Sequence, residues 1–524
     1  MRLSKRDSYI VLSTVFIIFV FLTVFDEHAF AREDQIVFKW AVEFLGWSQA
    51  FSLDHSDRTI GSGLTQEYEM ITGQYDSGGN LQWQIMNSPP YHPYNYNPKK
   101  LVTDNQNNIF IAGDRCNHFY TGWPPQCIGY NRFIMKYDKD GSLQWLNEID
   151  QSLIAEDFQA LAVDNNEDVV ALGFRNVMAL RPKPFLAKYG ANGDLIWQKE
   201  KAGSYSGLVS EEATGLKIDK NNNIYVFQCL GYTCYVAKYD QDGNRIWEVE
   251  DTAIWYQYGV NISLDGYGNV YVAGGDTSVG NLMKYDLNGN LIWTIDLFNI
   301  VAAHQFMVRQ MTTDAEGNAY VTGALTEESG YNPVFFTVKF DTDGNMLWNA
   351  TYIHPDYNRH IAFAINTFAD QHVIVAGLSE GEVYYKNAIS TLLYSPDGSE
   401  IWVHSYDCEY CDSFNSRMKI SFGNQNNIFL FVTESPGTIL KFDTTLPTDD
   451  DTADDDSVDD DSSTDDDSGD DDSADDDSAD DDLGADDDAS VDDDASVDDD
   501  ITDDDSHASE SSGDDASSGV SCGC

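Results

Sequence analysis

Two patterns of apolar and polar residues alternate along the middle of the chain. The first is Asp-x-x-x-Asn, then a short apolar and aromatic run that ends in Gly, as in Asp104–Gly113. The second is an apolar run ending in Lys-Tyr or a close variant, then Asp-x-x-Gly-x-x-x-Trp, as in Met135–Trp145. Short apolar runs bounded by Asp, Asn and Gly predict β-strands joined by tight turns.

Both patterns recur at a regular period. The Trp pattern is found at Asp76…Trp83, Asp138…Trp145, Gly190…Trp197, Asp240…Trp247, Asp286…Trp293, Asp341…Trp348 and Ser395…Trp402. An eighth copy starts at Lys441-Phe442-Asp443 and lacks its Trp. The other pattern starts at Asp54, Asp104, Asp164, Asp219, Asp265, Asp314, Phe368 and Gly423, with the first and last two copies weaker. This period is typical of propellers and repeat arrays.

Each repeat predicts four strands, which make one propeller blade. The eighth repeat has three strands, and Ile36–Phe44 near the N-terminus resembles a lone Trp strand. Pairing that segment with the last repeat would close the ring and remove two sheet edges. The sequence therefore predicts an all-β, eight-bladed propeller of four-stranded blades over residues 32–448, closed by an N-terminal strand. Seven blades is the alternative, if the Asp54 copy is false.

The repeated Trp and Tyr residues are interpreted as core that packs between adjacent sheets. The Asp-x-Asp-Gly turns, such as Asp240–Gly243, are interpreted as tight turns rather than calcium sites, because two carboxylates without further ligands do not complete such a site.

The loops are expected to separate onto two faces of the ring. Because strands alternate in direction, the short Asp/Gly turns share one face, here named the turn face. The connections between the second and third strands, and between successive blades, share the other, named the loop face. Loops on a rigid scaffold commonly carry binding residues. The aromatic residues Tyr91, Tyr94, Tyr96 and Trp123 fall on the loop face and are the candidate ligand-binding residues.

The eight cysteines fall into four local pairs. Three of the pairs are expected to form disulfides on the loop face: Cys116 with Cys127, Cys229 with Cys234, and Cys408 with Cys411. The Cys408–Cys411 spacing also occurs in redox and zinc sites, but the chain has no second such pair at metal spacing. The fourth pair, Cys522 and Cys524, is too closely spaced for an easy disulfide.

The N-terminal segment 1–31 is typical of a signal peptide. It has a basic start, an apolar run over Tyr9–Phe25 and the small-x-small sequence Ala29-Phe30-Ala31. The alternative is an uncleaved membrane anchor, because the apolar run approaches spanning length. Either interpretation places the protein outside the cytoplasm, secreted or at the cell surface, which agrees with disulfide formation.

Charge is concentrated at the other end of the chain. Of 89 acidic residues, 36 lie in residues 449–524, which contain no Lys or Arg. Such a low-complexity segment is expected to be a disordered, extended stalk with a Cys-Gly-Cys terminus that acts as a solvated spacer. Its carboxylates could bind calcium weakly, because carboxylate oxygens suit hard cations. The formal net charge of −59 argues against nucleic acid and anionic lipid as partners.

The repeat resembles a bacterial extracellular β-propeller repeat family, and is similar to NHL repeats, over nearly all of residues 36–443. The Asp-x-x-Gly-x-x-x-Trp segment also resembles the tryptophan-docking motif of quinoproteins. It lacks that motif's Thr before the Gly and has one residue fewer between Asp and Gly. The chain also has no vicinal Cys-Cys pair of the kind that quinoprotein dehydrogenases use. These resemblances imply the fold and leave the ligand open.

The function predicted is an exported, surface-displayed binding module for a glycan, protein or matrix ligand. No catalytic constellation, resident metal or cofactor is predicted, and a monomer with envelope attachment through the C-terminus is expected. The alternative is an exported quinoprotein-like or metal-dependent enzyme. In that case a metal or acid–base site could form on the loop face from His92, His118, His304, His354, His360 and His404.

Overall fold

The structure is a computed structural model, and it describes residues 36–44, 47–65, 68–87, 96–120, 126–149, 154–177, 181–200, 214–230, 233–251, 258–275, 280–300, 304–327, 332–368, 370–381, 387–408, 411, 417–424, 427–433 and 437–444. The predicted signal peptide 1–31, the stalk 449–524 and the Cys522/Cys524 ending lie outside these residues and stay predictions. In the described part of the chain, no helix has the length and apolar character needed to cross a membrane.

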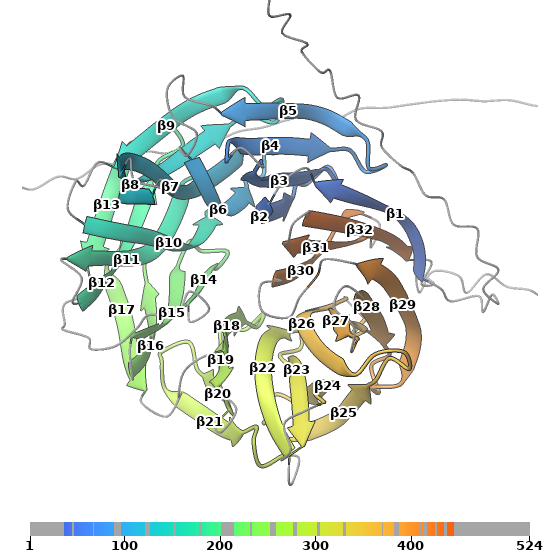
Figure 1. The fold of residues 1–524 in the computed structure, drawn as a ribbon. Helices are drawn as coiled ribbons and strands as arrows, with labels where there is room; N and C mark the ends of the chain where they lie inside the picture. Colours follow the sequence, from blue (N-terminus) through green and yellow to red (C-terminus); the bar gives the residue numbers. More distant parts are fainter. Residues whose placement is uncertain are drawn as a thin grey trace, which may run out of the picture. The chain divides into compact units, whose positions relative to one another are not determined.

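Eight antiparallel sheets of four strands form the ring of a β-propeller (Figure 1). Blades 1 to 4 contain β2 (Trp47–Leu53), β3 (Thr59–Leu64), β4 (Met70–Tyr75) and β5 (Leu81–Asn87); β6 (Tyr96–Thr103), β7 (Ile109–Tyr120), β8 (Gln126–Tyr137) and β9 (Leu143–Ile149); β10 (Ile154–Val163), β11 (Val169–Val177), β12 (Arg181–Tyr189) and β13 (Leu195–Glu200); and β14 (Thr214–Ile218), β15 (Ile224–Leu230), β16 (Thr233–Tyr239) and β17 (Arg245–Asp251).

Blades 5 to 8 continue the same order. They contain β18 (Tyr258–Leu264), β19 (Val270–Gly275), β20 (Gly280–Tyr285) and β21 (Leu291–Asp296); β22 (His304–Thr313), β23 (Ala319–Glu327), β24 (Val334–Phe340) and β25 (Met346–Tyr352); β26 (Arg359–Thr367), β27 (Val373–Glu380), β28 (Asn387–Tyr394) and β29 (Glu400–Cys408); and β30 (Arg417–Phe422), β31 (Ile428–Thr433), β32 (Gly437–Thr444) and β1 (Ile36–Phe44). The eight-bladed prediction is confirmed. The seven-bladed alternative is wrong, because the Asp54 copy forms blade 1.

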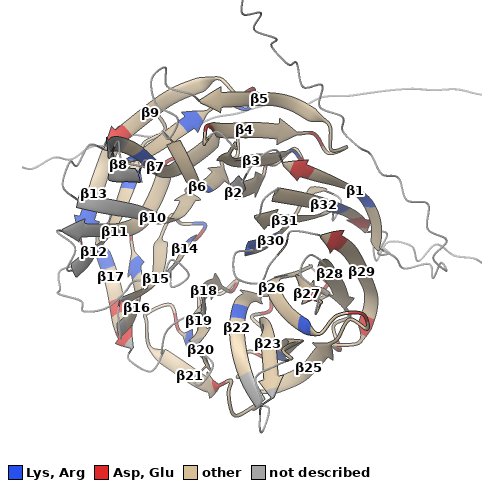
Figure 2. Cartoon of the chain, in the orientation of Figure 1, with Lys and Arg blue, Asp and Glu red and all other residues tan. Residues whose placement is uncertain are grey.

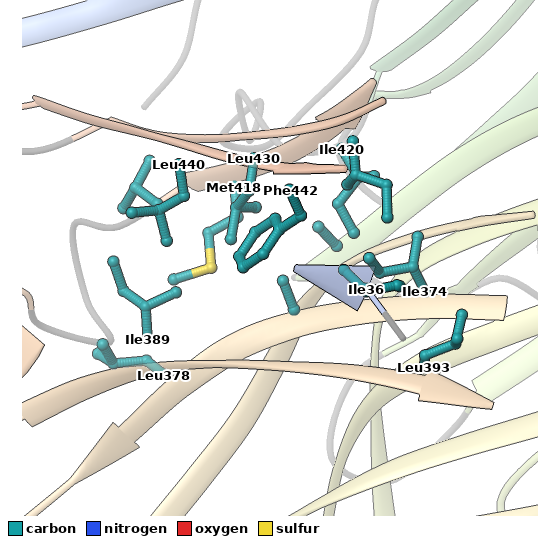
Figure 3. Close-up of a cluster of buried hydrophobic side chains, with 14 of the residues drawn as sticks. Ile36, Ile374, Leu378, Ile389, Leu393, Met418, Ile420, Leu430, Leu440 and Phe442 are labelled. Atoms are coloured by element: carbon teal, nitrogen blue, oxygen red, sulfur yellow. The ribbon is translucent and has the colours of Figure 1, made fainter. Parts of the chain in front are cut away.

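The N-terminal strand closes the ring as predicted. β1 pairs antiparallel with β32, from Ile36 opposite Thr444 to Phe44 opposite Gly437. Ile36 is buried in a cluster between blades 7 and 8 that includes Ile374 and Phe442 (Figure 3). The eighth sheet is therefore completed by strands from the two ends of the described chain. The facing edges of β32 and β1 are hydrogen-bonded to each other, so neither edge is left unpaired.

The motif aspartates make the turns, as expected. Asp240 Oδ1 accepts hydrogen bonds from the backbone N–H groups of Asp242 and Asn244, and Oδ2 accepts one from the Asn244 side chain. Asp104 makes the same contacts with Gln106 and Asn108 in its turn. Each carboxylate thus replaces backbone partners that the reversing chain cannot supply, which is the usual role of Asp in such turns.

The repeated Trp residues join each blade to the next. Seven donate a hydrogen bond from indole Nε1 to a backbone carbonyl in the following blade's turn: Trp40 to Ser77, Trp83 to Lys139, Trp145 to Ala191, Trp197 to Gln241, Trp247 to Leu287, Trp293 to Thr342 and Trp348 to Pro396. Most of these rings are half-buried, and they pack against the buried clusters of the core, as predicted. The Tyr residues that end the third strands, such as Tyr137 and Tyr285, are fully buried core as predicted.

The Gly that ends the first motif accommodates a β-bulge. In six blades the pairing of the first and second strands shifts register near the loop face. Each of these blades has Gly at the ninth position after the motif start, and a Cβ on Gly113 would lie only 2.0 Å from the Asn97 carbonyl oxygen. Blades 4 and 8 carry Gln228 and Val432 there, and their described pairs show no shift. Gly is needed because the bulged backbone comes so close.

Candidate functional site

Of the four candidate ligand-binding residues, one lies in the described part of the chain. Tyr91, Tyr94 and Trp123 lie outside it, so their assignment stays a prediction. Tyr96 is the first residue of β6 and pairs with Arg115 at the loop-face end of blade 2. It is half-buried, and its ring packs edge-on against Phe133 with centroids 5.0 Å apart.

Tyr96, Arg115 and Glu148 form a polar cluster, here named the blade 2 cluster. The Tyr96 hydroxyl donates a hydrogen bond of 2.5 Å to Glu148 Oε1. Arg115 forms an ion pair with Glu148 Oε2, and its guanidinium lies over the Tyr96 ring, 5.3 Å from the centroid. Burial, and then the hydrogen bond to Glu148, raises the pKa of Tyr96. The tyrosine is therefore a neutral hydroxyl donor held in one orientation.

More charged and aromatic groups continue from this cluster toward blade 3. Lys99 Nζ lies 2.9 Å from Asp114 Oδ2. The guanidinium of Arg132 is buried between two rings of blade 3, with its centre 4.8 Å from the Phe158 centroid and 4.3 Å from the Phe185 centroid. Such cation–π contacts in a desolvated position contribute about 2 kcal/mol. They fix the loop-face ends of blades 2 and 3 against each other.

Two of the three predicted disulfides lie among the described side chains. Cys229 and Cys234 face each other across β15 and β16 and are joined by a disulfide. A second disulfide joins Cys408, at the end of β29, to Cys411 in the following connection. Cys116 is also disulfide-bonded, and the side chain of its expected partner, Cys127, lies outside the described side chains. The two described bridges thus reinforce loop-face connections.

A cavity of about 520 Å³ lies between blades 3 and 4. Its lining combines aliphatic and aromatic side chains with both acidic and basic groups, including Lys199, Glu200, Tyr235, Arg245 and Glu250. A cavity of this size suits a small organic ligand. Its mixed charges do not select a ligand class.

The histidine site considered in the sequence analysis is not assembled by the described side chains. His360 is buried on β26, with His354 close enough to act on it electrostatically. His404 instead stacks against Phe38 of β1. His92 lies outside the described residues, as do the side chains of His118 and His304. Within the described ranges, no three His, Cys, Asp or Glu side chains come together as a metal site.

Arg115 and Glu148 belong to the blade 2 cluster but are not among the site residues predicted from the sequence. Glu148 is the second-last residue of β9, and Arg115 lies within β7, opposite the first residue of β6. The sequence did contain one signal for them: both are charged residues in strands whose other residues are typical of an apolar core. The pairing with Tyr96 was hidden, because Glu148 is 52 residues away in sequence.

Comparison with known proteins assigns no family to this chain. No protein-family model and no curated protein matches the chain. Among solved structures, it is similar to an ulvan-degrading polysaccharide lyase, with 11% identity, 78% of this chain and 95% of that chain covered, and a TM-score of 0.40. It is also similar to a Lactobacillus plantarum protein (12% identity, 66% and 95% covered, TM-score 0.41). A Bacteroides caccae protein of unknown function matches as well (11% identity, 56% and 93% covered, TM-score 0.31).

Proposed function

We propose that this propeller is an exported binding module that presents its loop face to a glycan, protein or matrix ligand. The observation that carries the proposal is the blade 2 cluster, in which Tyr96, Arg115 and Glu148 are held together at the loop-face end of the sheet. Tyr and Arg are enriched among the residues that dominate binding energy at interfaces. An orientation fixed before the ligand arrives reduces the entropy lost on binding.

The position of this cluster supports the proposal. Tyr96 is the first residue of β6, directly after the segment that contains Tyr91 and Tyr94, and Arg115 is on β7, the strand that precedes the segment containing Trp123. The disulfides Cys229–Cys234 and Cys408–Cys411 stiffen other connections on the same face. Disulfides persist in oxidising compartments, which agrees with export.

The test is a binding screen with the full chain against immobilised polysaccharides and extracellular-matrix proteins. A variant with Tyr91, Tyr94, Tyr96 and Trp123 changed to Ala should lose binding and keep the wild-type circular dichroism spectrum. Because Tyr96 is half-buried, a second variant keeps it and changes only the other three. Binding that survives in both variants would overturn the loop-face assignment.

A matched control comes from the turn face. Tyr267 lies in the turn after β18 and is 71% exposed. The variant Tyr267→Ala also removes an aromatic side chain, and it should leave binding unchanged. Equal loss of binding in this variant would show that exposed aromatics on either face act nonspecifically.

Export is tested by the mass of the protein recovered from its own cells. The extracytoplasmic fraction should contain a chain that begins at Arg32 and lacks the hydrogens of its disulfides. Recovery of the reduced, full-length chain from the cytoplasm would overturn this part of the proposal.

A further inference from the structure

The innermost strands reverse the charge bias of the protein. These strands are the first of each blade and surround the axis of the ring (Figure 1). Their acidic residues are Glu156 and Asp157, both on β10. Their basic residues are Lys99, Lys100, Lys217, Arg309, Arg359, Arg417 and Lys419 (Figure 2). In a chain with 30 basic and 89 acidic residues, this excess of cations at the axis is unexpected from composition.

Lys217 and Lys419 differ from the other basic residues of the innermost strands. Lys99 and Arg359 have carboxylate partners, Asp114 at 2.9 Å and Glu380 at 3.2 Å. Lys217 and Lys419 have no hydrogen-bond or ion-pair partner among the residues that the structure describes. Unpaired charges inside a ring of protein are costly, because neighbouring groups replace part of their hydration. An external anion would compensate that cost.

Lys217 and Lys419 come from opposite sides of the ring. Lys217 is on β14 of blade 4 and Lys419 is on β30 of blade 8, and these strands face each other across the axis (Figure 1). On β30 the side chains alternate, so that Met418 and Ile420 are buried between blades while Lys419 is exposed. Lys217 is likewise exposed beside the buried Leu216. Solvent therefore reaches both ammonium groups inside the ring.

The two ammonium groups also act on each other. Burial lowers the pKa of Lys217. Burial, and then the charge of Lys217, lowers the pKa of Lys419 to about 8. Both side chains are thus open to solvent and nevertheless surrounded by protein. A space that holds two repelling cations attracts an anion.

We propose that Lys217 and Lys419 form an anion-binding site on the propeller axis that holds a sulfate, phosphate or carboxylate group. Lysine ammonium groups bind such oxyanions as point charges with freely rotating donors. This axial site is separate from the blade 2 cluster.

The anion could be free in solution or part of an acidic polysaccharide, and the experiment separates these sources. The full chain is titrated at pH 7 with sodium sulfate, with dextran sulfate and with polygalacturonate, all at constant ionic strength with sodium chloride. Binding is followed by calorimetry and by the melting temperature. Saturable binding of sulfate identifies a free ion, whereas saturable binding of a polymer alone identifies a polymer-borne group.

The variants are Lys217→Gln, Lys419→Gln and the control Lys220→Gln. Lys220 lies in the turn that follows β14, so its variant makes the same charge change on the turn face. Each axial variant should weaken binding by roughly tenfold, as expected for loss of a charge-assisted contact. Lys220→Gln should bind like the wild type. Because removal of either axial lysine relieves repulsion, neither variant should unfold.

Two outcomes would overturn the axial site. One is the absence of saturable binding of all three probes at constant ionic strength. The other is binding that Lys217→Gln and Lys419→Gln leave unchanged. The variant with Tyr91, Tyr94 and Trp123 changed to Ala should keep anion binding, so failure of the loop-face proposal and failure of this one are distinguishable.

Discussion

Trp348 donates a hydrogen bond of 2.9 Å from indole Nε1 to the carbonyl of Pro396 in the next blade. Two residues farther on, Gly398 lies against the face of the same ring with a φ of +86°. A Cβ at Gly398 would lie 2.6 Å from Trp348 Cδ2, so the turn needs Gly for both its backbone conformation and its contact. Each motif therefore makes two separate contacts. Its Gly lies against the Trp of the preceding blade, and its Trp contacts the following blade.

This contact predicts a large effect for Gly398→Ala. The left-handed backbone costs about 1–2 kcal/mol for a residue with a Cβ, and the clash with Trp348 adds to it. We expect the free energy of unfolding to fall by more than about 3 kcal/mol. Gly268 is the matched control, because its φ is +87° and a Cβ there would meet no atom closer than 3.9 Å. Denaturant unfolding should show a smaller loss for Gly268→Ala, and equal losses would contradict the ring contact.

Because of the ring closure, we expect Trp402 to contribute to stability differently from the other repeated Trp residues. Trp402 of blade 7 faces blade 8, where β32 and β1 come from opposite ends of the chain and no turn joins them. Its ring packs edge-on against Phe442 at 5.4 Å instead. Trp348→Phe should lower the free energy of unfolding by about 1 kcal/mol more than Trp402→Phe, the usual net contribution of one hydrogen bond. Equal losses in denaturant unfolding would show that the indole hydrogen bond contributes nothing.

Closure by β1 predicts that a chain without residues 36–44 loses its cooperative melting transition. Ile36, Trp40 and Phe44 are buried, and burial of each such side chain contributes about 2 kcal/mol. Their loss also exposes the edge of β32, which promotes aggregation. A synthetic Ile36–Phe44 peptide added in trans should restore the transition in calorimetry. Val37→Ser is the control, because Val37 is 42% exposed; a stable truncated chain would contradict closure.

We expect the buried His360 to make the folded protein less stable in acid. It is 1% exposed, and its Nδ1 lies 3.1 Å from Ser379 Oγ. Burial, and then the charge of His354, lowers the pKa of His360 from 6.5 to about 4. The unfolded chain therefore binds the proton more readily, and stability falls as the pH drops from about 6.5 to about 4.

The full effect of His360 is about 3 kcal/mol, from 1.36 kcal/mol for each pKa unit. His360→Asn should flatten the dependence of the free energy of unfolding on pH in that window, as measured by urea denaturation. His55→Asn removes an exposed histidine and serves as the control. An unchanged slope in His360→Asn would show that other groups cause the acid response.

The repeat made the fold predictable. Each blade's turn chemistry is local, since the Asp240 carboxylate accepts hydrogen bonds from residues two and four positions away. Closure by Ile36–Phe44 could also be inferred, because one repeat lacked a strand and one strand lacked a repeat. The Gly of the first motif was recognised as a pattern only, because the bulge that requires it depends on a neighbouring strand.

Which residues come together in the two proposed sites became clear only from the tertiary structure. A sequence shows Lys217 and Lys419 as two ordinary charges about two hundred positions apart, and only a closed ring brings their strands to face each other. Glu148 likewise reaches Tyr96 only because four strands fold into one sheet. The sequence by itself determined the four-stranded repeat, its turns and the closing strand, since these follow from local patterns repeated at a fixed period. The tertiary structure decided which charges meet, because electrostatic energy depends on distance in space and not on separation along the chain.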